Sequence, residues 1–282
     1  MRADLVERAL EAYRFLPDAA VPRVLGAALG QASVALCLHR VNEAASELVI
    51  APDNLDALIG LVLRAQAARA GRLTVTFDDG YADAAAYVES RHARFPEVKW
   101  LLFVCPEKLT KRSGFRWDAA DGDGPLDVRT ENDRAALQGL ADAKAYQLMT
   151  VPACHALQKL ANVELGNHTN THFKHTDLSL EDSRFEIASS RKDFEALFGA
   201  SPHFAFPFGT PGSEVGAEHA QAAHDLGYPY VWSTEPRPYR EGESTGSSLL
   251  PRFPVRGTWP ARKIALYMSI RATRWRLRQL RA

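Results

Sequence analysis

The sequence predicts a barrel-like α/β fold in which about seven strands alternate with helices. Short apolar runs recur along the chain, and longer stretches between them repeat their apolar residues with a helical period. Strand, helix and strand at this spacing imply right-handed βαβ units and therefore a parallel sheet. A barrel-like arrangement is favoured over a doubly wound sheet because the sequence has no Gly-x-Gly-x-x-Gly turn after a strand.

The expected elements follow one another along the chain. Helices are expected at residues 4–16, 21–29, 54–68, 82–94, 131–146, 151–160 and 179–199, and before 226; strands are expected at 33–41, 73–77, 100–104, from 163, from 204, at 230–233 and at 249–255. Pro17 ends the first helix, and Ser179 begins a capping box whose helix ends at Gly199. Residues 106–130 predict a long surface loop, which either shapes a binding cleft or is an ordinary insertion.

Composition excludes several classes of protein. The 282 residues suffice for one large α/β domain or two small ones, and Lys+Arg and Asp+Glu are both 34, so no overall charge attracts nucleic acid or membranes. The three cysteines have no CxxC spacing, which indicates buried thiols in a reducing compartment. Charged residues interrupt the apolar ones near the N-terminus, and no run of about 18 uncharged apolar residues occurs. We therefore expect a cytoplasmic protein with neither a secretory signal nor a membrane span.

An acidic pair follows the strand at residues 73–77. Asp78 and Asp79 stand at its C-terminal end, which is where parallel α/β proteins build their ligand sites. Because successive side chains point in different directions, one carboxylate could bind a metal while the other handles a proton. Alternatively, Asp78-Asp79-Gly80 makes only a turn that caps the next helix, with a contribution from Asp83.

Two other strand ends carry histidines. His168 and His172 form a His-x-x-x-His pair, whose spacing lets both imidazoles reach one metal ion. With Asp79 as the third ligand, the site would keep room for a water molecule whose pKa the metal lowers. His175 is a fourth ligand, a partner of the ligands or a residue without a role, and the last interpretation is favoured. His39 ends an earlier strand, as a structural residue or a catalytic one.

A third junction, Phe204-Ala205-Phe206-Pro207-Phe208-Gly209, has a proline and a glycine that fix a turn and can aim backbone N–H groups into a cleft. Together with Thr76-Phe77-Asp78-Asp79-Gly80 and His168-Thr169-Asn170-Thr171-His172, this motif resembles the polysaccharide deacetylase family with the NodB homology domain. The likeness extends over roughly residues 34–255. It implies a distorted (β/α) barrel and metal-dependent removal of N-acetyl groups from sugars.

The resemblance also implies roles for the motif residues. Asp78 would be the catalytic base, and a divalent metal, usually zinc but with cobalt or nickel as alternatives, would be bound by Asp79, His168 and His172. The turn Pro207-Phe208-Gly209 would contact the substrate, and the backbone N–H of Phe208 would help to hold the oxyanion.

Two positions depart from the family pattern. The last strand, Leu250-Pro251-Arg252-Phe253-Pro254-Val255, lacks the histidine that usually protonates the leaving amine. One branch of the family resembles a circular permutation with this histidine on the first strand. Leu38-His39-Arg40-Val41 is similar to its motif, which assigns the acid to His39. Ala205 stands where the family has an arginine, and Arg252 is expected to replace that arginine in orienting Asp78.

The C-terminal residues 261–282 mix apolar and basic side chains and contain no acidic one. They predict a basic amphipathic helix, which either lies on an anionic membrane surface or packs on the barrel with a solvated basic face. In the first case the substrate would be a lipid-linked sugar at the cytoplasmic leaflet; nucleic acid is not an expected partner. The chain is expected to divide into N-terminal helices (1–32), a NodB-like deacetylase domain (33–257) and the basic helix (258–282).

Two classes of function follow. The first is a metal-dependent hydrolase that removes N-acetyl groups from an amino sugar in a surface polysaccharide or its lipid-linked precursor, with an amidohydrolase acting on a non-sugar C–N bond as its near variant. The second is a catalytically silent sugar-binding or scaffolding member of the fold. The paired aspartates and histidines favour the enzyme, because a binding module needs neither a base nor a set of metal ligands.

Overall fold

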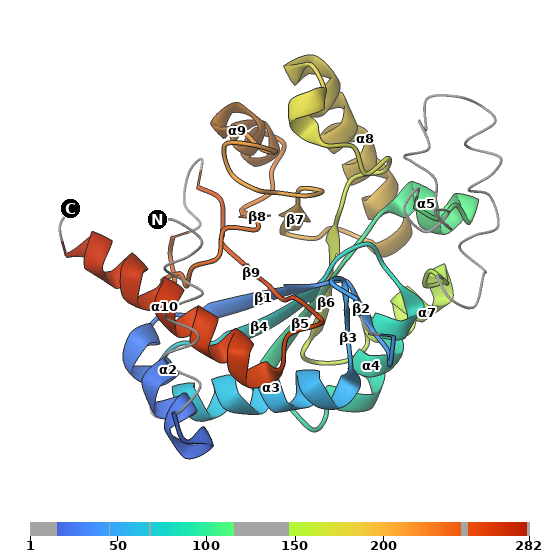
Figure 1. Ribbon diagram of the computed structural model, residues 1–282. Helices are drawn as coiled ribbons and strands as arrows, with labels where there is room; N and C mark the ends of the chain where they lie inside the picture. The colour runs from blue at the N-terminus through green and yellow to red at the C-terminus, as the bar shows by residue number, and fades with distance from the viewer. Residues whose placement is uncertain (1–15, 45, 68, 116–146, 244–247, 281–282) are drawn as a thin grey trace.

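A parallel sheet forms the centre of the protein. The computed structural model describes residues 16–44, 46–67, 69–115, 147–243 and 248–280. Its main sheet has seven strands in the order β8-β7-β6-β5-β4-β1-β9, and every neighbouring pair is parallel (Figure 1). The strands are β1 (Val34–Leu38), β4 (Leu73–Phe77), β5 (Val98–Val104), β6 (Val163–Asn167), β7 (His203–Ala205), β8 (Tyr230–Trp232) and β9 (Phe253–Pro254).

The sheet curls until its two edges meet. Trp232 at the end of β8 forms a parallel bridge with Leu250, which precedes β9, and the backbone N–H of Ser233 donates to the Leu250 carbonyl at 2.8 Å. This contact joins β8, at one edge of the sheet, to the segment that leads into β9 at the other edge. The predicted distorted (β/α) barrel of about seven parallel strands is therefore confirmed.

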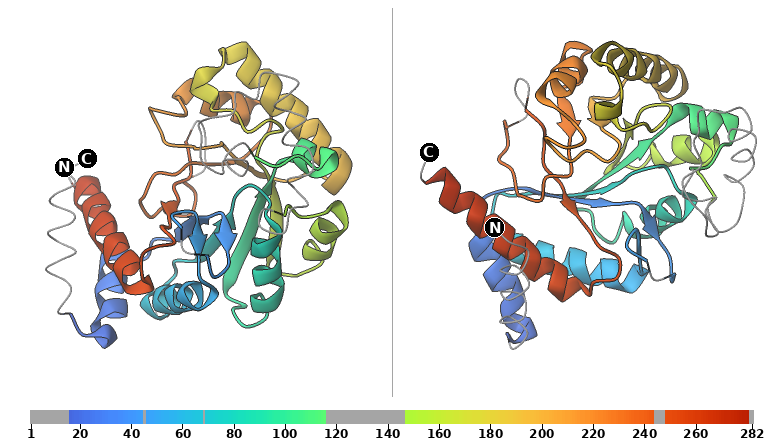
Figure 2. Two further views of the ribbon diagram at one scale, coloured as in Figure 1. Left: turned by 45° about the vertical axis from the view of Figure 1, so that its right-hand side comes forward. Right: turned by 45° about the horizontal axis from the view of Figure 1, so that its top comes forward.

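Helices surround the curled sheet on its outside (Figure 2). Their bounds are α2 (Val21–Leu29), α3 (Pro52–Gln66), α4 (Ala82–Arg91), α5 (Pro106–Lys111), α7 (Val151–Leu157), α8 (Leu180–Phe198), α9 (Ala217–Asp225) and α10 (Ala261–Gln279), with short 3-10 turns η2 (Asp18–Ala20) and η5 (His175–Asp177). The start of α8 is capped as predicted, because the Ser179 hydroxyl accepts a hydrogen bond from the backbone N–H of Asp182 at 3.1 Å.

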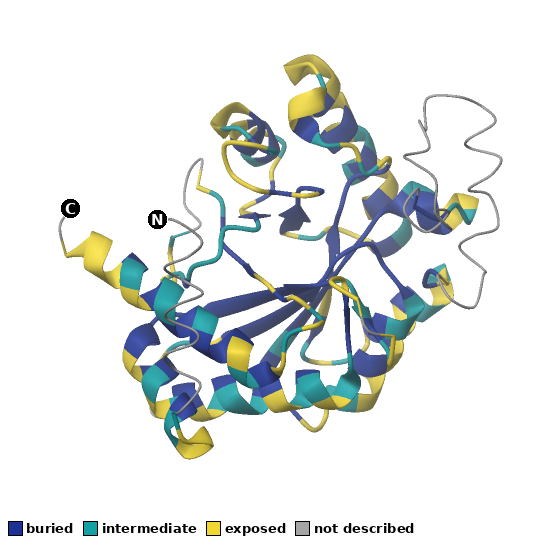
Figure 3. Cartoon of the chain, in the orientation of Figure 1, coloured by how far each residue is buried: buried dark blue, intermediate teal, exposed yellow. Residues whose placement is uncertain are grey.

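Apolar side chains cover both faces of the sheet, and its strands are coloured as buried along nearly all their length in Figure 3. Val75, Phe77 and Trp100 face outward and pack with the surrounding helices in the larger layer. Because side chains alternate along a strand, a smaller cluster that includes Phe103 fills the interior of the barrel. A Cβ on Gly166 would lie 2.4 Å from the Phe103 ring, so the glycine makes room for that ring.

The structure corrects two sequence-based expectations. The strand expected at 33–41 is broken at His39: β1 ends at Leu38, and β2 (Arg40–Val41) leaves the main sheet to pair with β3 (Val49–Ile50). The guanidinium of Arg40 contacts the carboxylate of Asp83 at 3.0 Å, outside the main sheet. Residues 106–111 of the expected loop are helical, because a proline at the first position starts a helix readily.

The predicted helix at 131–146 and nearly all of the one at 4–16 lie outside the described residues. The proposed division of the chain into three parts stays a prediction.

The C-terminal helix α10 packs against α2 and α3 (Figure 1). Its apolar face, including Ile264, Met268 and Trp275, is buried in that contact. Arg276 donates to the Ala27 carbonyl at 2.6 Å, where a cation complements the C-terminal end of α2. The structure thus shows this basic helix packed on the helices around the barrel, which is one of its two predicted arrangements. Within the described part of the chain, no helix is both long and apolar enough to cross a bilayer.

Candidate active site

The two adjacent aspartates lie at the C-terminal end of β4 and point in different directions. Asp78 continues the inward-facing side of the strand, and its backbone N–H donates to the Leu38 carbonyl at 2.9 Å. Asp79 has a φ of 74°, which non-glycine residues seldom adopt, and Gly80 follows with a φ of 80°. Both carboxylates are buried. The turn thus presents two carboxylates with separate environments, as the sequence predicted.

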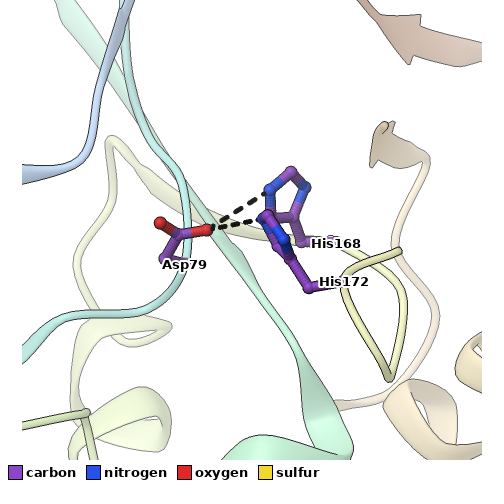
Figure 4. A group of neighbouring side chains, drawn as sticks. All are labelled: Asp79, His168 and His172. Carbon is purple, nitrogen blue, oxygen red and sulfur yellow. Dashed lines mark ion pairs between the residues drawn. The ribbon is translucent and has the colours of Figure 1, made fainter. Parts of the chain in front are cut away.

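Asp79 lies beside both histidines of the His-x-x-x-His pair (Figure 4). Its Oδ1 is 3.0 Å from His172 Nε2 and 3.6 Å from His168 Nε2. One ligand atom from each residue falls within 4.8 Å of the others, and His168 and His172 reach this point from the end of β6 and the turn behind it. The fold therefore brings the three predicted metal ligands together.

The chemistry of these three side chains fits a divalent cation. Asp79 Oδ1 is buried, and the Nε2 atoms of both histidines lie beside it. His168 Nδ1 lies 2.8 Å from the Ala205 carbonyl, which can only accept, so Nδ1 carries the proton and the Nε2 lone pair faces Asp79. Burial lowers the pKa of His168 to about 4, which keeps the imidazole neutral. Two imidazoles and one carboxylate form the ligand set of an open divalent-metal site.

Asp78 is held by a buried arginine. Arg252 Nη1 donates to Oδ1 at 2.6 Å and Nη2 donates to Oδ2 at 3.0 Å, which makes a bidentate ion pair. Burial alone would raise the pKa of Asp78, but the guanidinium of Arg252, with help from His168, holds that pKa well below its usual range. Asp78 is consequently ionised at neutral pH.

Arg252 itself is fully buried and fixed on every side. Nε donates to the Ser233 carbonyl at 3.1 Å, Nη1 also donates to the Thr76 hydroxyl at 3.0 Å, and the guanidinium lies 5.2 Å from the Phe103 ring centre. These contacts leave the guanidinium one orientation, in which its two outer nitrogens face Asp78. The expectation that Arg252 would reach Asp78 therefore agrees with the geometry.

Two further predicted residues line a cavity of about 480 Å³. His39, at the end of β1, and Phe208, after β7, line this cavity together with both aspartates and both histidines. In the turn Pro207-Phe208-Gly209, the Gly209 N–H donates to the Pro207 carbonyl at 2.7 Å, and Phe208 has a φ of 62°. The Phe208 ring centre lies 5.3 Å from that of His172. Of this turn, Phe208 lines the cavity, beside His172.

Some residues at the site were not predicted. Cys37 donates its thiol to Asp78 Oδ2 at 3.5 Å, and burial raises the pKa of this thiol. The Phe115 ring centre lies 5.2 Å from that of His172. Cys37 lies two positions before His39, on the inward-facing side of β1, and this spacing could have identified it. Phe115 belongs to the segment 106–130, which was expected either to shape a binding cleft or to be an ordinary insertion, and its ring lies against His172.

His175 does not join the three ligands. Its Nδ1 lies 2.6 Å from the Ser183 hydroxyl, and its ring packs against Phe206, with centres 4.8 Å apart. Among the described residues, the group of candidate ligands consists of Asp79, His168 and His172.

Comparisons with known proteins agree with this geometry. The family model for polysaccharide deacetylases matches residues 136–231, which include His168, His172 and the turn at 207–209 but not the aspartate pair. No match was found among curated protein sequences.

Three solved structures share the fold at low sequence identity. The deacetylase PplD of Streptococcus pyogenes, solved with acetate, has a TM-score of 0.57 and 14% identity, over 84% of this chain and 98% of that one. A de-N-acetylase from Aggregatibacter actinomycetemcomitans has a TM-score of 0.58 and 11% identity, over 83% and 99%. IcaB from Ammonifex degensii has a TM-score of 0.56 and 16% identity, over 85% and 98%.

Proposed function

We propose that the chain is a member of the polysaccharide deacetylase family and a metal-dependent hydrolase that removes N-acetyl groups from an amino sugar; the family-model match over residues 136–231 and the shared fold support this. One observation carries the proposal. Asp79, His168 and His172 converge at the wall of a cavity that also contains Asp78, which Arg252 keeps ionised. A set of three metal ligands beside a buried base is typical of a hydrolase, whereas a binding module needs neither.

Three residues would hold the metal, and the surrounding contacts orient them toward one point. Asp79 supplies a buried carboxylate oxygen, and the carbonyl of Ala205 orients His168 so that its free nitrogen faces the same point. His172 packs edge-to-face with the rings of both Phe115 and Phe208. A divalent metal bound here would supply Lewis-acid activation of water and of the amide carbonyl.

Asp78 is the proposed base. Arg252 leaves it deprotonated and fixes the direction of both oxygens, and Oδ2 lies 4.0 Å from His168 Nε2, on the side of the ligand triad. A carboxylate in this position can accept the proton of an attacking water molecule. Because its pKa is low, Asp78 is a weak base, but it is fully deprotonated at neutral pH and can accept a proton from water.

The leaving amine and the oxyanion need further groups. His39 lines the same cavity on another strand end and is the proposed acid that protonates the amine. The backbone N–H of Phe208, in the turn with Pro207 and Gly209, is the proposed donor to the oxyanion. Arg252 is the proposed substitute for the arginine that Ala205 replaces.

The substrate is proposed to be an N-acetylated saccharide of a surface polysaccharide or its lipid-linked precursor, met at the cytoplasmic face of a membrane. The apolar face of α10 is used in packing, so a peripheral membrane contact would come from its last turn, where Leu277 and Leu280 are exposed beside Arg276 and Arg278. A silent sugar-binding protein is the second candidate. Two departures from the family pattern favour it: the arginine is missing at Ala205, and the acid would be His39 instead of a histidine on the last strand.

The deciding experiment measures bound metal after purification without chelators, together with acetate release from N-acetylated sugars before and after chelation. We expect about one divalent ion per chain and acetate release that chelation abolishes and zinc, cobalt or nickel restores. Metal without acetate release would favour another acyl group, a lipid-linked substrate or the silent protein. Failure to bind any of the three metals would contradict the ligand triad itself.

A further inference from the structure

Helix α8 carries a row of polar side chains toward the segment that contains the two histidine ligands. Residues three or four positions apart share one face of a helix, and Ser183, Glu186, Ser190 and Asp193 have this spacing. Each of the four contacts the segment 167–175. This face of α8 therefore contacts the segment around the candidate metal ligands through each of its four polar residues.

Glu186 makes the most concentrated of these contacts. Its Oε1 accepts hydrogen bonds from the backbone N–H of Asn170 at 2.9 Å, from that of Thr171 at 2.7 Å and from the Thr171 hydroxyl at 2.7 Å. Only 8% of Glu186 is exposed. A buried carboxylate that accepts three hydrogen bonds holds its donors strongly, because hydrogen bonds to a charged acceptor are stronger than neutral ones.

The other three residues of the row also contact the segment, and the Ser183 hydroxyl lies 2.6 Å from His175 Nδ1. The Asn167 amide donates to the Ser190 hydroxyl at 3.0 Å, and the Asn170 amide donates to Asp193 Oδ2 at 2.7 Å. Asn170 also accepts from the backbone N–H of Glu107, at the start of α5. The two residues that follow Thr169 are thus fixed to two helices.

The turn needs this support because its backbone is unusual. Thr169 has a φ of 66° and His172 a φ of 62°, in the left-handed region that residues with a side chain rarely adopt. These two residues lie on either side of the pair that Glu186 binds. A turn with such a backbone persists only where surrounding contacts determine it.

We propose that Glu186 is a positioning residue of the metal centre. It holds Asn170 and Thr171 so that the turn between His168 and His172 directs both imidazoles at Asp79. The inference rests on the proposed function, because it assumes that these three residues bind a metal. Its test separates the two.

The test compares Glu186→Gln and Glu186→Ala with the wild-type protein. Zn²⁺ affinity is measured by competition with a chromophoric chelator, and the visible d–d absorption of bound Co²⁺ reports the geometry of the ligands. Partners that orient metal ligands typically contribute ten- to a hundredfold to affinity. We expect the Ala variant to bind Zn²⁺ about a hundredfold more weakly and the Gln variant, which keeps an acceptor oxygen without the charge, about tenfold more weakly. The Co²⁺ spectrum should change in both.

A matched control is Glu195→Gln on the same helix, since Glu195 pairs with Arg191 at 2.7 Å on the exposed side. It should bind Zn²⁺ like the wild type. Faster exchange of the Asn170 and Thr171 amide hydrogens in the metal-free Glu186 variants is the independent readout.

Unchanged Zn²⁺ affinity in a folded Glu186→Ala variant would overturn the inference, and if that variant does not fold, unchanged affinity in Glu186→Gln would do the same. A wild-type protein that binds no metal would instead refute the proposed metal centre.

Discussion

Replacing Arg252 by methionine should destabilise the protein strongly, because it leaves Asp78 buried without a counter-charge. The guanidinium is completely buried and makes a bidentate pair with Asp78, and only 4% of Asp78 is exposed. Removing one partner of a buried pair typically costs about 3–5 kcal/mol, because the remaining charge must be neutralised or desolvated. We expect Arg252→Met and Asp78→Asn each to lose about this amount of the free energy of unfolding.

The double variant should lose much less than the sum of the two changes, because neither charge then remains unpaired. The measurement is urea unfolding followed by circular dichroism at pH 7, in the presence of a chelator so that metal binding does not contribute. A coupling energy of about 3 kcal/mol or more is expected from the double-mutant cycle.

The exposed pair between Arg184 and Asp225 provides the control. Its atoms are 3.2 Å apart, but its side chains are 45% and 41% exposed, so Arg184→Met should cost less than about 1 kcal/mol. Additive effects of the Arg252 and Asp78 substitutions, within about 0.5 kcal/mol, would refute the reasoning that this pair is energetically coupled.

Three further outcomes are expected. Asp78→Asn should retain bound metal but lose hydrolysis by about 10²–10⁴-fold, since it removes the base and not a ligand; acetate release at the wild-type rate would contradict the mechanism. His168→Ala and His172→Ala should each lose metal, as measured by metal analysis after dialysis, whereas stoichiometric metal in either would exclude that residue as a ligand. Burial lowers the pKa of His175 from 6.5 to about 3, so the unfolded chain takes up a proton below about pH 6.5 that the folded chain does not. The free energy of unfolding therefore falls as the pH drops from about 6.5 toward 3, by about 2 kcal/mol at pH 5. In urea unfolding, His175→Gln should lose correspondingly less of this free energy between pH 7 and pH 5. The same pH dependence in the variant as in the wild type would contradict this assignment.

Strands and helices were predictable where the pattern is local. The alternation in Leu73–Phe77 places Asp78 and Asp79 at a strand end, and the hydroxyl of Ser179 caps α8 as its sequence indicates. The break at His39 was not predictable, because the apolar run continues through it. The contact of Arg40 with Asp83, distant in the sequence, turns the chain away from the sheet.

The partners of the site residues were less accessible to sequence reasoning. The presence of Arg252 at a strand end suggested a contact with Asp78, although 174 positions separate the two residues. Glu186 gave no comparable signal, because a glutamate within an amphipathic helix is usually solvated. Only its helical spacing from Ser183 and Ser190 distinguishes it, and that spacing acquires a meaning once the segment it faces is known.

The sequence by itself determined the chemical groups and their local geometry: an acidic pair after a strand, two imidazoles four positions apart and a proline–glycine turn, each set by backbone periodicity over a few residues. Only the tertiary structure decided which of these groups share a cavity, which carboxylate receives the guanidinium, and whether the apolar face of α10 is buried by protein. The physical reason is that an amphipathic helix has the same pattern on a membrane and on a barrel. In this structure the apolar face packs on α2 and α3, which lie far earlier in the chain.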